Sequence, residues 1–325
     1  MRSAATLLFV IAAVLAVVPG WSGTERLALL GRHPQLIATR VPLEPGNHAR
    51  RRLGRLTYLG GVSLSSRDPA FGGFSALSVT GSRVTLLSDG GNIVRFRLGG
   101  EGGVADVHFG DLPAGPGTGW RKRDRDSESM AVDPRSGAIW LGFEGSNAIW
   151  RFAPGFRRWE REVRPGAMRR WSANSGPEST VRRRDGSFVV IAEGATHGLG
   201  RAALVFAHDP TLGGRPALRF RYLPPAGFDP ADATELPDGR LLVLNRRWRA
   251  PLRFASALSV IERGAIRPGA LVRGREIARL EAPLIHDNFE GVAATVERGR
   301  TIVWLVSDNN QTVFERTLLL KLRLE

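Results

Sequence analysis

The chain contains no cysteine, and it has few of several other reactive or metal-binding side chains. Among its 325 residues there are 3 methionines, 2 tyrosines and 6 histidines. Without cysteine, neither disulfide bonds nor thiolate metal sites can form. A metal ion would have to be held mainly by oxygen ligands, which favours a hard cation such as Ca²⁺.

Sequence motifs of several common enzyme classes are also missing. The chain has no Gly-x-Ser-x-Gly nucleophile elbow, no phosphate-binding P-loop, no His-Glu-x-x-His zinc motif and no dinucleotide fingerprint. The arginine-glycine-histidine pattern of histidine phosphatases is absent as well. These absences argue against serine-triad hydrolysis and nucleotide chemistry. No amphipathic helix longer than two turns is apparent, which favours an all-β fold.

The N-terminal apolar run, from Ala4 to Val18, is short for a membrane-spanning helix, which needs about 20 apolar residues. Arg2 precedes this run, so residues 1–23 are predicted to be a secretory signal peptide. Because no clear Ala-x-Ala cleavage site follows, an uncleaved N-terminal anchor in the inner membrane is the alternative. In both cases we expect the folded part outside the cytoplasm, periplasmic or secreted.

Glycine and proline are abundant, with 39 and 20 residues, and they separate short apolar strands. One pattern recurs five times: a head residue, a short strand, a glycine turn and a second apolar strand ending in a polar residue. The heads are Ser75, Glu128, Glu178, Asp232 and Glu290, and the second strands end at Asp89, Glu144, Glu193, Asn245 and Asp308. Successive heads are 53, 50, 54 and 58 residues apart. A period of about 50 residues built from short strands is typical of β-propeller blades, each a four-stranded sheet.

We therefore predict that residues 55–325 form a single β-propeller domain and that residues 24–54 are a lead-in segment. Within the lead-in, Leu36–Val41 is expected to form an edge strand. The segments Arg55–Leu64 and Thr317–Leu324 are expected to pair within one blade, because propellers usually close by joining strands from the two ends of the chain.

Rotation of the blades about one axis would bring the equivalent acids together in two rings at the central channel. Like charges so close repel and raise one another's pKa values unless a cation lies among them. We therefore predict a Ca²⁺ site with the ligands Asp89, Glu128, Glu144, Glu178, Glu193, Asp232, Glu290 and Asp308. The alternative is that each acid only caps a turn or accepts a backbone N–H bond.

Basic residues outnumber acidic ones, with 46 Lys+Arg against 31 Asp+Glu and a formal net charge of +15. Such a balance predicts an anionic partner, here an anionic small-molecule substrate. A genome rich in G and C would also favour arginine and is the alternative explanation. No nucleic-acid-binding motif is recognisable, so nucleic acid is not expected as a partner.

Three side chains next to the predicted rings are candidates for binding the substrate. Arg246 and Arg247 follow directly on Asn245, and arginine offers paired N–H donors that suit phosphate oxygens. His197 lies just beyond Glu193 and is a candidate acid–base group or phosphate contact. The alternatives are ordinary salt bridges for the arginines and a structural role for the histidine.

Several segments together carry a family resemblance. They are Tyr58–Leu64, Phe71–Leu77, Asp126–Asn147, Asn174–Glu178, Phe228–Trp248, Asn288–Val292 and Ser307–Asn310. These segments resemble the phytase-like family of exported bacterial propellers, described as having esterase-like activity of phytase. The resemblance implies a Ca²⁺-dependent phosphomonoesterase and six blades, which we favour over the five visible copies. Segments 208–228 and 262–286 would then supply the additional strands. Ser75 and Asn245 depart from the acidic pattern and leave the two rings incomplete.

The leading hypothesis is thus a hydrolase that cleaves a phosphoester or another ester of an anionic small molecule. Glu178 or Glu290 would be the catalytic base beside Ca²⁺, and Arg246, Arg247 and His197 would hold the substrate. Two other hypotheses remain open. One is a non-catalytic propeller that binds a ligand or a protein, and the other is a lactonase-like Ca²⁺ propeller that acts on an uncharged ester.

Overall fold

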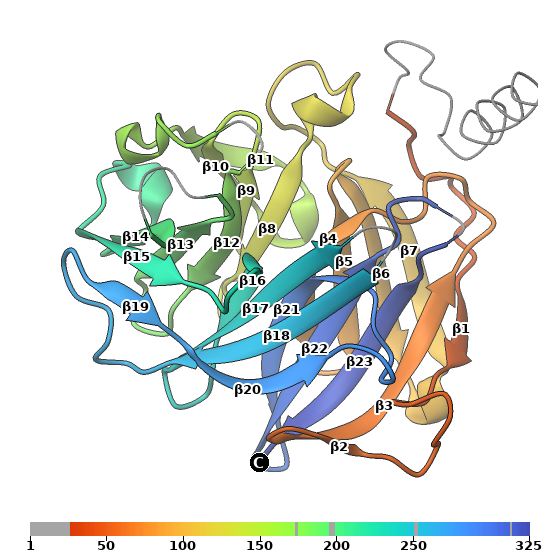
Figure 1. The fold of residues 1–325 in the computed structure, drawn as a ribbon. Coiled ribbons are helices and arrows are strands. Elements are labelled where there is room, and N and C mark those ends of the chain that lie inside the picture. The colour runs from red at the N-terminus through yellow and green to blue at the C-terminus, as the bar shows by residue number, and fades with distance from the viewer. Residues whose placement is uncertain (1–26, 173–174, 195–198, 250–252, 313) are drawn as a thin grey trace, which may run out of the picture.

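The computed structural model describes residues 27–172, 175–194, 199–249, 253–312 and 314–325. The predicted signal peptide or anchor, residues 1–23, lies outside them. Within the described part of the chain, no helix is both long enough and apolar enough to span a membrane. Five β-sheets make up nearly all of the regular structure, and Figure 1 labels their strands.

Four of the five sheets, or blades, follow the chain in order. The first contains β4 (Phe74–Thr80), β5 (Arg83–Ser88), β6 (Asn92–Leu98) and β7 (Val104–Asp111). The second contains β8 (Ser127–Val132), β9 (Ile139–Phe143), β10 (Ala148–Phe152) and β11 (Trp159–Val163). The third contains β12 (Pro177–Arg182), β13 (Phe188–Ala192), β14 (Arg201–Phe206), β15 (Leu218–Leu223) and β19 (Leu271–Arg273). The fourth contains β16 (Asp229–Glu235), β17 (Leu241–Arg249), β18 (Arg253–Ile261) and β20 (Arg275–Leu280).

The fifth sheet, which we name the closure blade, joins the two ends of the chain. It contains β21 (Asn288–Glu297), β22 (Arg300–Asp308), β23 (Thr317–Leu324), β3 (Leu56–Ser65), β1 (Ile37–Arg40) and β2 (Arg52–Leu53). Strand β23 pairs antiparallel with β3, and β1 pairs with the outer edge of β3. The predicted closure and the predicted edge strand in the lead-in are therefore both confirmed.

Short 3₁₀ turns punctuate the connections between strands. They are η1 (Gly100–Gly102), η2 (Lys122–Asp124), η3 (Pro154–Phe156), η4 (Gly166–Met168) and η5 (Pro210–Leu212).

The innermost strands of the blades form a closed ring. Strand β4 contacts β8, β8 contacts β12, β12 contacts β16, β16 contacts β21, and β21 returns to β4. The fold is therefore an all-β propeller, as predicted, and its five blades lie within the predicted range of five to six. Segments 208–228 and 262–286 do contain further strands, but β15, β19 and β20 extend the third and fourth blades instead of building a sixth.

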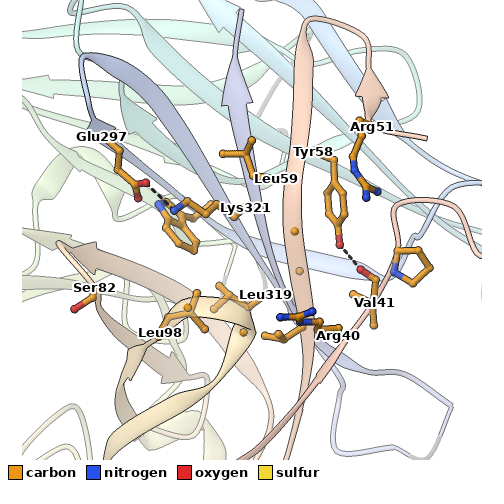
Figure 2. A pocket seen from close by; sticks show the side chains of 18 of the residues that line it. Arg40, Val41, Arg51, Tyr58, Leu59, Ser82, Leu98, Glu297, Leu319 and Lys321 are labelled. Carbon is orange, nitrogen blue, oxygen red and sulfur yellow. Dashed lines mark hydrogen bonds and ion pairs between the residues drawn. The ribbon is translucent and has the colours of Figure 1, made fainter. Parts of the chain in front are cut away.

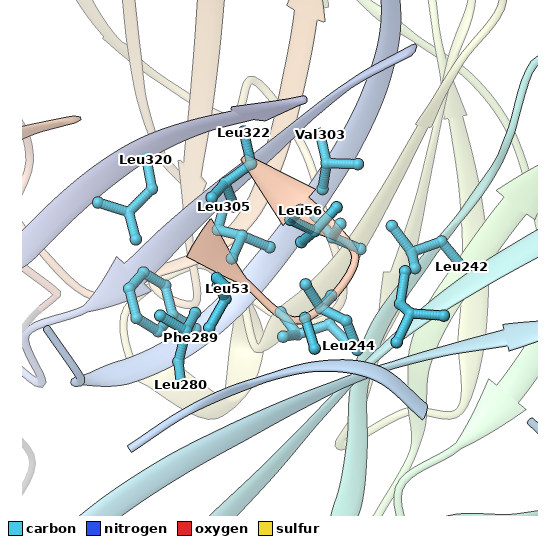
Figure 3. Packing of buried hydrophobic residues seen from close by; sticks show 14 of the residues in the cluster. Leu53, Leu56, Leu242, Leu244, Leu280, Phe289, Val303, Leu305, Leu320 and Leu322 are labelled. Carbon is cyan, nitrogen blue, oxygen red and sulfur yellow. The ribbon is translucent and has the colours of Figure 1, made fainter. Parts of the chain in front are cut away.

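The core consists of apolar layers between neighbouring blades. On β22, Val303 and Leu305 face the fourth blade, whereas Ile302, Trp304 and Val306 face the first. A strand alternates its side chains between two faces, and here both faces are buried. This double burial explains why the second strand of each blade reads as an unbroken apolar run. Figure 3 shows the layer between the closure blade and the fourth blade, where leucines from β2, β3, β17, β20 and β23 interdigitate.

Candidate functional site: a cluster of acids on the inner strands

In four blades the head residue lies at a β-bulge, where one residue of the inner strand has no partner on the second strand. The unpaired residues are Ser75, Glu128, Glu178 and Glu290. A bulge bends its strand and re-aims the side chain that it carries. Each bulge lies near the start of its inner strand, so the three glutamates are presented at the same end of the propeller.

The fourth blade is out of phase with the others by one residue. The register of β16 against β17 shifts between Pro230 and Asp232, so its unpaired residue is Ala231. The last residue before this bulge, Pro230, pairs with Asn245 on β17. The next residue along β17 is therefore Arg246 rather than Asn245. The residues at this place in the other blades are Asp89, Glu144, Glu193 and Asp308. The second ring therefore contains an arginine in the fourth blade.

Asp232 and Asn245 consequently contact backbone and core groups. The Asp232 carboxylate accepts the N–H of Ala233 at 2.7 Å and, across the blade boundary, the N–H of Val292 at 2.8 Å. Burial raises the pKa of Asp232 well above its usual value, while these two N–H groups lower it. Asn245 is fully buried and accepts the Tyr222 hydroxyl at 2.9 Å. The structure thus gives both residues bonds that tie strands together.

Six other acids converge, and we name them the central acid cluster: Asp126, Glu128, Glu144, Glu178, Glu193 and Glu290. They form three overlapping triads, Asp126–Glu128–Glu144, Glu128–Glu178–Glu290 and Glu144–Glu178–Glu193. Within each triad, one carboxylate oxygen of every residue lies within 4.8 Å of the others. Five of the six are predicted ring residues. Asp126 was not among the predicted ligands. Its position two residues before the head residue Glu128 is the sequence feature that could have indicated it.

Burial and mutual repulsion disfavour the charged form of most of these acids. Burial, followed by the neighbouring Glu290 carboxylate, raises the pKa of Glu128 well above its usual range. Burial and then Glu128 do the same to the pKa of Glu178. Burial and then Asp126 raise the pKa of Glu144 to about 7. Without a cation, these shifts favour the protonated, neutral form of the acids.

Two basic side chains offset part of this charge. Arg246 donates from Nη1 to Glu290 Oε1 and from Nη2 to Glu193 Oε1, both at 2.8 Å. The Glu290 carboxylate is foremost in raising the pKa of Arg246. Lys122 Nζ lies 2.6 Å from Asp89 Oδ2 at the edge of the cluster. Arg246 belongs to the fourth blade, and its guanidinium links Glu193 of the third blade to Glu290 of the closure blade.

The cluster fits a hard divalent cation. Oxygen ligands of Ca²⁺ lie at roughly 2.3–2.6 Å from the ion, so two ligands of one ion are at most about 5 Å apart, and each triad meets this limit. Asp126 also lies close to Glu144 and Glu128, with one carboxylate oxygen of each within 4.8 Å of the others. Carboxylates so close repel one another when charged, and either protonation or a bound cation relieves this repulsion. The residues that would hold an ion are Glu128, Glu178 and Glu290, with Asp126, Glu144 and Glu193 beside them.

The remaining predicted site residues lie at or beyond the edge of the cluster. Asp308 Oδ1 accepts the N–H of Asn310 at 2.7 Å, and burial followed by Glu290 raises its pKa well above the usual value. Arg247 pairs with Glu281 at 3.2 Å and lies over the Phe228 ring at 4.5 Å, so it is directed away from Arg246 and its acids. His197 lies outside the described residues.

The fold and the acid cluster define a class, the five-bladed β-propellers with carboxylates on their inner strands. Within that class, the model of the family described as "Phytase-like: Esterase-like activity of phytase" matches residues 69–311. The chain therefore belongs to this phytase-like family, and the predicted resemblance is confirmed.

Other comparisons are distant. No curated protein matches the chain. Hydrazine synthase of Kuenenia stuttgartiensis is 14% identical over 72% of this chain and 76% of its own, with a TM-score of 0.40. The bifunctional GH43-CE protein of Bacteroides eggerthii is 12% identical over 77% of this chain and 33% of its own, with a TM-score of 0.48. The chain thus spans about a third of the length of the second structure, and similarities at this level do not inform on function.

Proposed function

We propose that this protein is an exported hydrolase that binds Ca²⁺ at the central acid cluster and cleaves a phosphomonoester or other ester of an anionic small molecule. One observation carries the proposal: Glu128, Glu178 and Glu290, from three different blades, are buried together with oxygens within 4.8 Å of one another. Acids in such an arrangement repel one another when charged, and a bound cation would relieve this repulsion. Export is inferred from residues 1–23 of the sequence alone.

A bound Ca²⁺ ion would neutralise the substrate anion, polarise the oxygen at the reacting centre and lower the pKa of a bound water. The protein's own groups then divide the remaining work. Glu290 is held by Arg246 at 2.8 Å and by the Asn288 amide at 2.6 Å, both on the same oxygen, so its position and charge are constrained. Glu290 is therefore suited to hold the ion.

Glu178 is better suited than Glu290 to accept the proton of the attacking water. Arg246 and the Asn288 amide hold Glu290 as a charged ligand, which leaves Glu178 as the carboxylate that would accept the proton. Arg246 and Lys122 supply positive charge near the cluster, which would favour an anionic substrate over a neutral one.

A non-catalytic binding propeller is the second candidate, and Arg246 is the observation that favours it. By joining Glu193 to Glu290, this arginine balances part of the cluster without any metal. In that case the acids would link blades, as Asp232 does, and the propeller would present its surface to a ligand or partner protein.

The deciding experiment measures turnover of a panel of phosphomonoesters, carboxylic esters and lactones, each with added Ca²⁺ and with a Ca²⁺ chelator. We expect Ca²⁺-dependent release of phosphate or acid from an anionic substrate. Preference for neutral lactones would favour the lactonase-like alternative. Calcium binding without turnover of any substrate, under any divalent metal, would contradict the hydrolase and favour the binding propeller.

A further inference from the structure

A hollow lies at the end of the propeller opposite the central acid cluster, between the closure blade and the first blade. It encloses about 980 Å³ and is drawn in Figure 2. Its walls include the β4–β5 turn at Gly81–Ser82 and the β21–β22 turn at Glu297. The acids lie where the inner strands begin, and these turns lie where the same strands end. The hollow is therefore separate from the central acid cluster.

A bulge in β3 creates this hollow. Gly60 pairs with Lys321 and Tyr58 with Leu322, so Leu59 is left without a partner. Before the bulge, Tyr58 packs toward the fourth blade, and after it Val62 packs toward the first. Before the bulge, the buried apolar side chains of β3 therefore face away from the first blade. Leu59 is 45% exposed there.

Glycines keep the hollow open. At Gly60 the backbone has φ of +149°, which favours glycine, and a Cβ atom at this position would meet nothing within 4 Å. Across the hollow, the first blade contributes the glycine-rich stretch 99–102 after Leu98. Strained, side-chain-free backbone beside a cavity is a common feature of binding sites.

The inner walls are apolar and the rim is basic. Leu59, which is 45% exposed, and the half-buried Leu98 form the accessible apolar surface, whereas Leu319 and Trp304 also line the hollow but are buried. Among the described lining side chains, basic groups outnumber acidic ones, and Glu297 is paired with Lys321 at 2.7 Å. The Arg51 guanidinium donates to the backbone carbonyl of His48 at 2.9 Å, which fixes its position at the rim. In Figure 2, Arg51 lies on the same side of the β3 ribbon as Val41, and Lys321 lies on the other side.

We propose that this hollow is a binding site for an amphiphilic anion, a molecule with an apolar body and one negatively charged group. The apolar body would lie against Leu59 and Leu98, and the charged group would meet the guanidinium of Arg51. Arginine retains further N–H donors after it has bonded a carbonyl, so Arg51 can bind a carboxylate or sulfonate. A ligand here would contact both the closure blade and the first blade.

The test uses the anionic dye anilinonaphthalene sulfonate as the probe, with decanoate, decanol and decyltrimethylammonium as competitors. We expect saturable fluorescence enhancement and displacement by decanoate at lower concentration than by decanol, with no displacement by the cation. Arg51→Glu and Ser82→Asp add negative charge at two separate walls. Each should weaken dye binding by about five-fold or more, the value of roughly one partly exposed ion pair.

Arg219→Glu is the matched control, because Arg219 is exposed on β15 and does not line the hollow. It changes the net charge as much as Arg51→Glu and should leave dye affinity within about two-fold. Both rim residues are exposed, and unchanged melting curves will verify that the variants fold. Equal loss of affinity in the control, unchanged affinity in both rim variants, or displacement by decanol as strong as by decanoate would each overturn the proposal.

Discussion

Glu178 and Asp232 occupy matching positions in the sequence repeat, yet their surroundings differ. Glu178 is the unpaired residue of a bulge and lies among acids from three blades. Asp232 is paired with Leu244 one residue after its bulge, and its oxygens accept backbone N–H groups. The difference teaches that a buried acid is tolerated in two ways: by donors that the fold provides, or by convergence on a place where a cation can bind.

Replacement of Glu178 should have the largest effect on activity. In Glu178→Gln the proton acceptor is lost, and turnover should fall about 10²–10⁴-fold. Measured without calcium, the melting temperature should stay level or rise, because a repelled buried charge has been removed. Glu262→Gln serves as the control, since the Glu262 side chain is 62% exposed and its partner is Arg240. Retention of more than half of the activity in Glu178→Gln would remove this residue from the mechanism.

Replacement of Asp232 should instead act on stability. Asp232→Ala leaves the N–H groups of Val292 and Ala233 buried without their acceptor, which should cost about 2–4 kcal/mol in the free energy of unfolding. Denaturant unfolding measures this loss. The comparison variant Asp185→Ala, at a side chain 59% exposed, should cost less than about 1 kcal/mol. If Asp232→Ala abolished calcium binding and left stability unchanged, Asp232 would belong with Glu178 after all.

The pH dependence of stability should distinguish the acid cluster from the rest of the molecule. Glu144 has a pKa of about 7 in the folded state against 4.5 as its ordinary value, because of burial and the Asp126 carboxylate. The folded state holds this proton more tightly, so stability is fully present below about pH 4.5 and is lost as the pH rises through 7. Calcium should reverse this loss by favouring the charged form.

Melting temperatures measured across this pH window, with chelator and with calcium, test the expectation. Glu144→Gln should make the loss of melting temperature with rising pH smaller in chelator, whereas Glu262→Gln should reproduce the wild-type curve. A wild-type profile that rises with pH in chelator would contradict the raised pKa.

The smallest effect is expected at Ser75, the head residue that carries no charge. Its hydroxyl donates to the carbonyl of Ser127 in the second blade at 2.6 Å. Ser75→Ala should therefore cost about 1 kcal/mol in unfolding free energy, the usual net value of one hydrogen bond. Calcium affinity should not change, and a large loss of calcium binding would show that Ser75 belongs functionally with the glutamates.

The blade repeat and most of the acid cluster were predictable because both depend on local patterns. The spacing of heads near 50 residues, the glycine turns and the unbroken apolar second strands are visible in the chain itself. Rotation then brings Glu128, Glu178 and Glu290 together without further information. The closure of β3 with β23 followed from the apolar segments at the two ends of the folded part.

The number of blades and the one-residue register shift of the fourth blade were harder to predict from the sequence. The additional strands in 208–228 and 262–286 are present, but whether they extend old blades or form a new one depends on pairing partners far away in the chain. Likewise, Asn245 aligns with the acids in sequence, while Arg246 takes that place in the structure. Asp126 and Lys122 join the cluster only because the segment before β8 passes over it.

The sequence by itself therefore determined an all-β repeat, its closure and an excess of acids at strand starts, since strand alternation and turn chemistry are local. Only the tertiary structure decided which acid lies at a bulge, which is bonded by backbone N–H groups, and where an arginine enters between Glu193 and Glu290. The physical reason is strand register: a shift by one residue moves a side chain to the other face of its strand, and pairing between strands, not spacing along the chain, sets that shift.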